Sequence, residues 1–268
     1  MATSISTPLI APSGEFDSTF VTAAKSELAN SGLVRIAHFP STAHAFVGFL
    51  AAFGDPLPYY GDDAGTHPDH PAIWRVRYEP QAAERGEIHA MAGPLEPHSS
   101  QSLRWPRPPF FSMLMVSSGW QDRPEGYNGE TLVVRWSDAV QLMRSDPAGA
   151  AAVRNLFTDV PFPDGIHRSI AYRLTNAADA DDVGIRIKSG LLDHLRSTAA
   201  RHPATSALKR LSEAAAQVAT RVTLRSGDLL LLDNNRWGHG RESVIGYEID
   251  VGGAVKLNPR ELWSATVG

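Results

Sequence analysis

The stretch "LRSGDLLLLDNNRWGHGR" (residues 224–241) joins a Ser-Gly-Asp turn, four consecutive leucines and a cluster of polar side chains. Four leucines in succession are typical of a strand that is buried on both faces. Such a strand would bring Asp233, Asn234, Arg236 and His239 together at the mouth of a β core. A lone histidine after a strand is usually structural. The density of Asp, Asn, Arg and His within nine residues (233–241) favours a functional site instead.

Outward from this stretch, short apolar or alternating runs predict many strands dispersed along the chain. The expected strands fall at residues 33–39, 72–80, 110–118, 130–136, 167–176 and 183–189, twice within 221–234, and as a hairpin and final strand in 246–267. Apolar residues at helical spacing predict helices at 15–32, 41–54, 137–143 and 205–220, with Ser41 and Ser137 as N-caps. Since no βαβ rhythm is present, we predict one mostly antiparallel β domain with helices packed outside.

Composition limits the class of protein. The chain has 268 residues and is 43% hydrophobic, enough to bury one substantial core. A net charge of −4 and a pI near 6.2 argue against a nucleic-acid or anionic-membrane partner, because both need a concentrated basic surface. The absence of cysteine excludes disulfides and thiolate chemistry, so any metal would be held by histidine and carboxylate ligands.

The N-terminal "MATSISTPLIAPSGEF" has no basic segment followed by a sustained apolar stretch, so it is not typical of a secretion signal. No apolar run approaches the roughly 18 residues that a membrane span needs. We therefore expect a cytoplasmic protein without a membrane partner, with a flexible N-terminus over residues 1–14.

The run Asp233-Asn234-x-Arg236-x-x-His239-Gly240-Arg241 resembles the distal-histidine motif of the iron(II)/2-oxoglutarate-dependent oxygenases. It is closest to the group that includes taurine dioxygenase, clavaminate synthase and carbapenem synthase. In that family the histidine is one ligand of a facial triad of two histidines and one carboxylate on iron. The resemblance assigns this ligand role to His239.

Other segments match the family in the expected order. "LEPHSS" resembles the family's His-x-Asp element and supplies His98 as a second metal ligand, and "PPFFSMLMVSS" resembles the strand that follows. "GETLVV" and "NPRELWS" supply Thr131 and Arg260, which the resemblance assigns to the far carboxylate of 2-oxoglutarate. Because the match covers roughly residues 33–266, it implies one jelly-roll (double-stranded β-helix) domain, mainly β with flanking helices, over residues 1–268.

Each of these roles has a structural alternative. Thr131 lies in a predicted strand, where threonine is simply favoured, and Arg260 fits equally well as a surface arginine. Arg260 lies 21 residues after His239, whereas the family's gap is little more than ten, and the extra length is the predicted hairpin. Many members have a second arginine four residues later, but Ser264 stands there, so that contact with the substrate does not transfer. Arg236 and Arg241 are either partners of Asp233 or anion binders.

The clearest departure from the family is the missing carboxylate two residues after the first histidine, where Ser100 stands. In a first interpretation Ser100 marks a halogenase, in which chloride binds iron in the vacated place. In a second, water or Glu96 completes the site of an atypical hydroxylase or desaturase; Glu96 is two residues from His98 and would share its strand face. In a third, the chain is a metal-independent binding protein or a non-redox enzyme on the same fold.

The resemblance thus implies an oxidoreductase that uses iron(II), 2-oxoglutarate and O2 to functionalise a C–H bond. Its substrate would be a small amino-acid-like or natural-product molecule, and chloride would be a further cofactor in the halogenase interpretation. We expect the aromatic cluster Tyr59, Tyr60, Trp74 and Tyr78 in the core, and the alternative is that it lines a pocket. The residues specify neither the substrate nor the oligomeric state.

Overall fold

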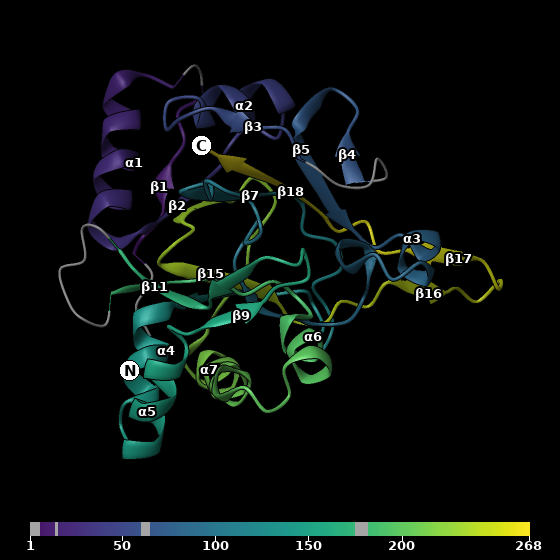
Figure 1. Cartoon of the computed structure of the whole chain (residues 1–268). Helices are drawn as coiled ribbons and strands as arrows, with labels where there is room; N and C mark the ends of the chain where they lie inside the picture. Colours follow the sequence, from purple (N-terminus) through teal and green to yellow (C-terminus); the bar gives the residue numbers. More distant parts are fainter. Residues whose placement is uncertain (1–5, 14–15, 60–64, 175–181) are drawn as a thin grey trace.

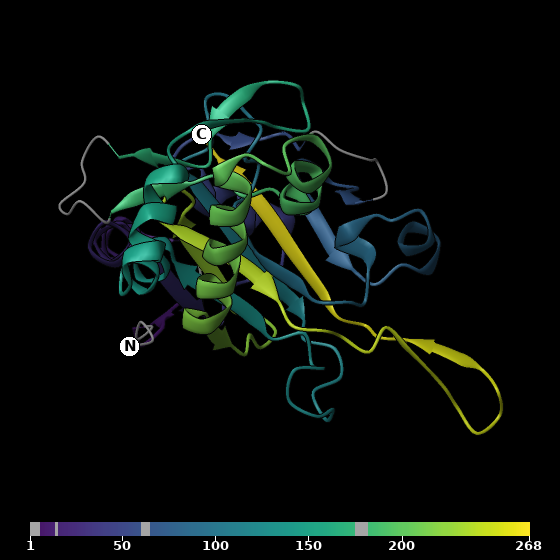
Figure 2. The ribbon, with the colours of Figure 1, turned by 60° about the horizontal axis from the view of Figure 1, so that its bottom comes forward.

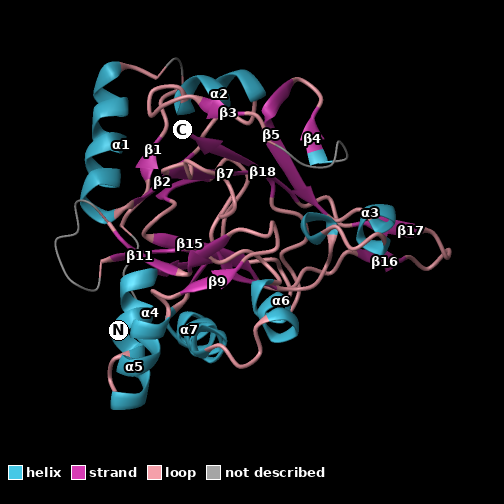
Figure 3. Cartoon of the chain, in the orientation of Figure 1, coloured by secondary structure: helices cyan, strands magenta, loops and turns pink. Residues whose placement is uncertain are grey.

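Two β-sheets face each other in the computed structural model, with helices on their outer sides (Figures 1 and 3). The structure describes residues 6–13, 16–59, 65–174 and 182–268. Pairing between neighbouring strands is antiparallel except for the two N-terminal strands of the larger sheet. The predicted class, mainly β with flanking helices around a jelly-roll core, is confirmed.

The larger sheet has eight strands among the described residues, and the C-terminal strand lies near its middle. In spatial order its strands are β1 (Leu9–Ile10), β2 (Leu33–Ala37), β14 (Leu229–Asp233), β7 (Phe110–Ser117), β18 (Glu261–Val267), β5 (His70–Arg77) and β4 (Thr66–His67), with β3 (Pro56–Leu57) also paired to β18. β1 lies within the segment expected to be flexible. For residues 1–5 and 14, which are outside the described residues, that expectation stays a prediction.

The smaller sheet carries both histidines. Its order is β13 (Thr220–Val222), β8 (Thr131–Arg135), β15 (Trp237–Arg241) and β6 (Leu95–His98). The register places His239 opposite His98, and Arg241 opposite Thr131. Side chains two residues apart on a strand share a face, so His239 and Arg241 point to the same side of the sheet.

The four leucines of β14 are buried on both faces, as the sequence predicts. Leu229 and Leu231 pack in the outer core, beneath α1 (Ser18–Ser31) and α2 (Ala43–Leu50). Leu230 and Leu232 pack between the two sheets. One strand therefore ties together two hydrophobic cores and ends where the polar cluster begins.

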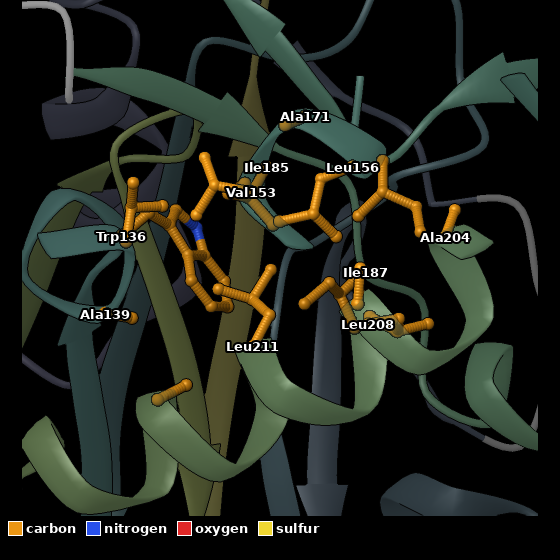
Figure 4. Packing of buried hydrophobic residues seen from close by; sticks show 14 of the residues in the cluster. Trp136, Ala139, Val153, Leu156, Ala171, Ile185, Ile187, Ala204, Leu208 and Leu211 are labelled. Carbon is orange, nitrogen blue, oxygen red and sulfur yellow. The ribbon is translucent and has the colours of Figure 1, made fainter. Parts of the chain in front are cut away.

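A third core covers the outer face of the smaller sheet (Figure 4). Its centre is Trp136 at the start of α4, which packs among residues of the neighbouring helices and short strands. These elements are α4 (Trp136–Met143), α5 (Pro147–Asn155), β9 (Asp159–Pro161), β10 (His167–Ser169), β11 (Ala171–Arg173), β12 (Val183–Ile185), α6 (Leu191–Thr198) and α7 (Pro203–Val218). The sequence analysis did not predict α5 and α6, and it joined β10 and β11 into one strand.

The two predicted N-caps are wrong by a short shift. Thr42, not Ser41, caps α2, because its side chain accepts a hydrogen bond from the main-chain N–H of Ala45 at 3.2 Å. Helix α4 begins at Trp136, one residue before Ser137, and its first turn has no side-chain cap. There the buried tryptophan fixes the start of the helix through packing.

Two excursions leave the sandwich. Between β5 and β6 the chain forms the short helix α3 (Pro80–Glu84) and the 3-10 turn η2 (Ile88–Ala90). After β15 it forms the predicted hairpin, β16 (Tyr247–Ile249) and β17 (Val255–Leu257), which projects away from the sheets (Figure 2). None of the helices in the described ranges is long and apolar enough to span a membrane.

Candidate active site

A cavity of about 470 Å³ lies between the two sheets. Residues of both sheets line it, together with the segment between β5 and β6 and the residues after β12. Every residue assigned a site role from the sequence lines this one cavity: His98, Ser100, Thr131, His239 and Arg260. The tertiary structure therefore brings together residues that are up to 162 positions apart.

The two histidines lie side by side. His98 and His239 face each other across neighbouring strands, and their ring centroids are 4.4 Å apart. Directly opposed residues of an antiparallel pair project to the same face, so both rings enter the cavity. Phe111 of β7 stacks on the ring of His239 at 4.1 Å from the opposite sheet. The two rings therefore lie close together in one cavity, which makes them candidate ligands of a single metal ion.

Both imidazoles are held neutral, which is the form that binds a metal. Burial lowers the pKa of His98, although the bond between its Nδ1 and the main-chain oxygen of Glu96, at 3.0 Å, acts in the other direction. That bond places the proton on Nδ1 and leaves the lone pair on Nε2. Burial lowers the pKa of His239 well below its usual value, and the nearby His98 and the charge of Arg107 act in the same direction. The buried Nδ1 of His239 has no partner among the described residues.

Within the described residues, no carboxylate joins the two histidines in a group that could hold a metal. In the described part of the chain, no group of three or more His, Cys, Asp or Glu residues could hold a metal ion. Glu96 is exposed and does not line the cavity, so the interpretation in which it completes the site finds no support in the geometry. Ser100 is buried, 8% exposed, at the cavity wall. The site thus offers two neutral nitrogen ligands and a small neutral side chain where an acid would be expected.

Asn234 fixes the main chain of Ser100. Its Oδ1 accepts from the N–H of Ser100 at 3.1 Å, and its Nδ2 donates to the carbonyls of Ser100 and Pro108, both at 3.0 Å. Asn234 is 0% exposed, so water does not compete for these bonds. The preceding Ser99 donates from its hydroxyl to the carbonyl of Ile185 at 2.7 Å. The segment after His98 is therefore held on two sides.

Arg260 lies immediately before β18 and is buried, with 4% of its surface exposed. Its Nη2 donates to the carbonyl of Gly129 at 3.0 Å. Gly129 has φ +68°, and a Cβ there would lie 2.7 Å from the Nε of Arg260, so only glycine leaves room for the guanidinium. Thr131, two residues later, is buried and lines the same cavity. The structural alternative of a surface arginine is wrong for Arg260.

Arg241 adds a second buried guanidinium beside Arg260. Burial lowers the pKa of Arg241 to about 10. Burial and the charge of Arg241 together lower the pKa of Arg260 to about 9. The Nε atoms of both arginines lack a hydrogen-bond partner within the described ranges. Two neighbouring buried cations with unsatisfied donors form a site for an anion, and a dicarboxylate such as 2-oxoglutarate suits the donor set.

Arg236 has a different role from Arg241, although the sequence left them equivalent. Arg236 pairs with Asp233 at 2.7 Å and with Asp182 at 3.0 Å. It does not line the cavity. Arg236 is therefore the structural partner of Asp233, and Arg241 is the candidate anion ligand.

One wall of the cavity carries aromatic and charged side chains. Tyr59 stacks on Trp74 with ring centroids 4.3 Å apart, and His89 contacts the same indole edge-on at 4.8 Å. Glu87 lies beside them, with its Oε2 3.4 Å from the Nε2 of His89, and Lys188 lines the cavity from the segment after β12. These residues form a wall suited to a small polar molecule that carries both charged and apolar groups.

The sequence predicts burial in the core for Tyr59, Trp74 and Tyr78. Trp74 is buried, as expected, and it also lines the cavity together with Tyr59, whereas Tyr78 stacks on Tyr247 of the hairpin with centroids 6.3 Å apart. Tyr60 lies outside the described residues. Glu87 and His89 were not singled out, because an isolated Glu-x-His without partners gives no signal in a single sequence.

Comparison with known proteins supports this architecture. No protein-family model and no curated protein matches the chain. The crystal structure of asparagine oxygenase (AsnO) matches with a TM-score of 0.65 at 16% identity, covering 94% of this chain and 79% of that one. The non-haem iron oxygenase OrfP, crystallised with Fe and alpha-ketoglutaric acid, matches with a TM-score of 0.58 at 16% identity, covering 92% and 78%. This chain has the fold of the non-haem iron oxygenases.

A further structure with this fold, the PvcB protein from Pseudomonas aeruginosa, matches with a TM-score of 0.59 at 16% identity, covering 92% of this chain and 79% of that one. An identity of 16% establishes the shared non-haem iron oxygenase fold, so the chemistry must be derived from this chain's own residues. Two of them depart from the family pattern at the cavity wall: Ser100 replaces the acid, and Ser264 stands where a second arginine is common.

Proposed function

We propose that this chain is a cytoplasmic iron(II)/2-oxoglutarate-dependent enzyme that oxidises a C–H bond of a small amino-acid-like or natural-product substrate. The observation that supports this most strongly is that one cavity holds two adjacent neutral histidines and two buried guanidiniums, each of which has unsatisfied donors among the described residues. A metal satisfies the first pair and an anion satisfies the second.

The residues fit both cofactors. His98 and His239 would hold iron(II) through neutral imidazole nitrogens, and Thr131 and Arg260 would hold the far carboxylate of 2-oxoglutarate. Iron(II) with 2-oxoglutarate and O2 supplies an oxidant strong enough to break an unactivated C–H bond. The protein supplies the ligand geometry, the binding of the dicarboxylate and the placement of the substrate in a cavity between two sheets.

Ser100 leads us to propose halogenation as the outcome. With Ser100 in place of an acid, the site has one negative charge fewer, so an anion such as chloride meets less repulsion there. The bonds from Asn234 fix the main chain of Ser100, which keeps this place small and neutral. Chloride is accordingly the further cofactor of this proposal.

A hydroxylase with water in that place is the second candidate. Asparagine oxygenase was crystallised with Fe(II), 2S,3S-3-hydroxyasparagine and succinate, and OrfP with Fe, succinate and (3S)-hydroxy-L-Arg. These products favour an amino-acid-like substrate here as well. Glu87 and Lys188 in the cavity lining suit the positive amino group and the negative carboxylate of such a molecule.

Anaerobic titration with iron(II) and 2-oxoglutarate tests the proposal. We expect both to bind and to produce the weak visible charge-transfer absorption that 2-oxoglutarate gives when it chelates iron. In a matched titration, the variant His239→Ala should show neither iron(II) binding nor the visible absorption. If iron(II) does not bind to the wild-type protein, the proposed function is wrong and the metal-independent interpretation replaces it.

Ser100→Asp distinguishes the two outcomes. If Ser100 marks a place for chloride, we expect chloride to shift the visible absorption of the wild-type protein and to have no effect on Ser100→Asp, whose carboxylate occupies the place. Bromide should act like chloride. A spectrum that does not respond to halide in the wild-type protein would favour hydroxylation instead. Ser102→Asp, at a second buried serine of the same cavity, is the matched control and should not confer resistance to chloride.

A further inference from the structure

Arg241 occupies a position between two parts of the cavity. It lies two residues after His239 on β15 and opposite Thr131 of β8, and it lines the cavity beside Arg260. From the sequence, Arg241 was either a partner of Asp233 or an anion binder. We infer its role from the hydrogen-bond partners of its three side-chain nitrogens.

One nitrogen of Arg241 donates hydrogen bonds to the segment that carries Glu87 and His89. Its Nη2 donates to the carbonyl of Met91 at 2.6 Å and to the carbonyl of Gly93 at 2.7 Å. Both carbonyls belong to the segment between α3 and β6, residues 85–94. The same segment supplies Glu87, Ile88 and His89 to the cavity. Arg241 thus fastens the wall on which the substrate would lie to the sheet that carries the histidines.

The remaining nitrogens of Arg241 are unused. Its Nε and Nη1 are buried and have no hydrogen-bond partner in the part of the chain that the structure describes. A buried cationic donor without an acceptor costs free energy, and the neighbouring charge of Arg260 adds repulsion. An anion between the two guanidiniums would accept their free N–H groups and remove the repulsion. A carboxylate has enough lone pairs to accept from both.

We infer that Arg241 is a second cationic ligand for the carboxylate of the co-substrate, and that its bonds to Met91 and Gly93 couple co-substrate binding to the order of residues 85–94. This inference rests on the proposed function. When the dicarboxylate engages Nε and Nη1, the guanidinium loses its freedom to move, and Nη2 holds the two carbonyls more firmly. The wall for the substrate is then completed after the co-substrate is bound.

Two features of the segment make it responsive to such a coupling. Gly86 has φ +82°, and Ile88 and Met91 are 39% and 40% exposed, so these two large apolar side chains add little burial to the segment. A coupling between two sites is reciprocal, so a molecule that orders residues 85–94 should in turn raise the affinity for 2-oxoglutarate. Lysine cannot replace Arg241 in this role, because it lacks the planar fork that directs donors to both sides at once.

Hydrogen–deuterium exchange of residues 85–94 tests the inference in the iron(II)-loaded protein under argon, with and without saturating 2-oxoglutarate. We compare the wild type with Arg241→Lys, Arg241→Gln and the control Arg221→Lys, an exposed arginine of the same sheet that pairs with Glu125 and Glu242. We expect 2-oxoglutarate to slow exchange in the wild type and the control by about tenfold or more. In both Arg241 variants this protection should disappear, and 2-oxoglutarate should bind about tenfold or more weakly.

The outcomes separate the inference from the proposed function. Iron(II) binding by the variants, measured before 2-oxoglutarate is added, shows that each has folded, and having two substitutions guards against the failure of one. If the Arg241 variants bind 2-oxoglutarate and protect residues 85–94 like the wild type, the inference is overturned and the proposed function stands. If the wild type binds iron(II) but never 2-oxoglutarate, both are overturned.

Discussion

At the scale of single residues, Ser100 and Asn234 act together, joined by two hydrogen bonds. The type of either residue alone does not predict this pairing. Ser100 removes a charge from the site, and Asn234 fixes the main chain on which that change is made. A buried amide that satisfies three main-chain groups cannot be replaced by an apolar side chain without cost, because those groups have no access to water. The geometry of the proposed chloride place therefore depends on Asn234, which does not line the cavity.

Asn234→Ala is expected to lower the free energy of unfolding by about 2–5 kcal/mol, because it strands the buried N–H and C=O of Ser100 and the C=O of Pro108. Iron(II) affinity should fall as well, since the segment after His98 loses its support. Chemical denaturation and iron titration measure the two effects. Asn30→Ala, at an exposed helical position, is the control and should stay within about 0.5 kcal/mol of wild type. Equal stability of the two variants would contradict the role given to Asn234.

At the scale of elements, β18 is held to β5 by side chains as well as by its ladder. Glu261 accepts from Arg75 Nε and Nη2 at 2.8 and 2.9 Å, and from Trp263 Nε1 at 2.7 Å. Burial by itself would raise the pKa of Glu261, but the bonds from Arg75 and Trp263 outweigh it and lower the pKa below the ordinary 4.5. This cluster lies next to Arg260 and so supports the position of the anion site.

The sign of this shift gives a pH prediction. Because the pKa of Glu261 is lower in the folded than in the unfolded state, its stabilisation is complete above pH 4.5 and is lost as the pH falls through the lowered value. Glu261→Gln should therefore cost about 1–2 kcal/mol at pH 7 and progressively less at more acidic pH. Denaturation at pH 7, 5 and 3.5 measures this. Asp193→Asn, which alters an exposed ion pair with Arg196, should change stability little at any pH.

At the scale of the whole molecule, separate hydrophobic cores support the cavity from outside. The outer core beneath α1 and α2 packs on the far face of the larger sheet, and the core around Trp136 packs on the far face of the smaller one. Residues of the intervening core, such as Phe111 and Met113, reach the cavity directly. Stability and ligand binding should therefore respond differently to substitutions in different cores.

Phe46→Ala tests this separation. Phe46 is 0% exposed in the outer core, so its truncation should lower the free energy of unfolding by about 3–5 kcal/mol. Affinity for iron(II) and 2-oxoglutarate, measured well below the unfolding transition, should stay near that of wild type. Val251→Ala, at a fully exposed hairpin position, should change neither quantity. A large loss of ligand affinity in folded Phe46→Ala would show that the outer core also shapes the cavity.

The local pattern of the sequence was sufficient for most of the longer strands and helices, the buried leucine strand, the final hairpin and strand, and the mostly antiparallel fold. Each of these depends on side-chain periodicity or on turn residues, which are readable along the chain. The predicted cap at Ser41 was wrong because the neighbouring Thr42 caps α2. The predicted cap at Ser137 was wrong because α4 already begins at the packed Trp136. Helices α5 and α6 are short, and much of their stability comes from the core they complete.

By itself the sequence determined which residues were available to the site: His98, His239, Thr131, Arg260 and a serine in place of an acid. Only the tertiary structure decided that Glu96 is exposed outside the cavity lining, that Arg236 pairs with acids, and that Arg241 and Arg260 line one cavity. The reason is physical: periodicity tells which residues share a face of a strand, but not which face closes on the other sheet. Long-range packing decides which face that is. It thereby also decides the environment of every charged side chain in the site.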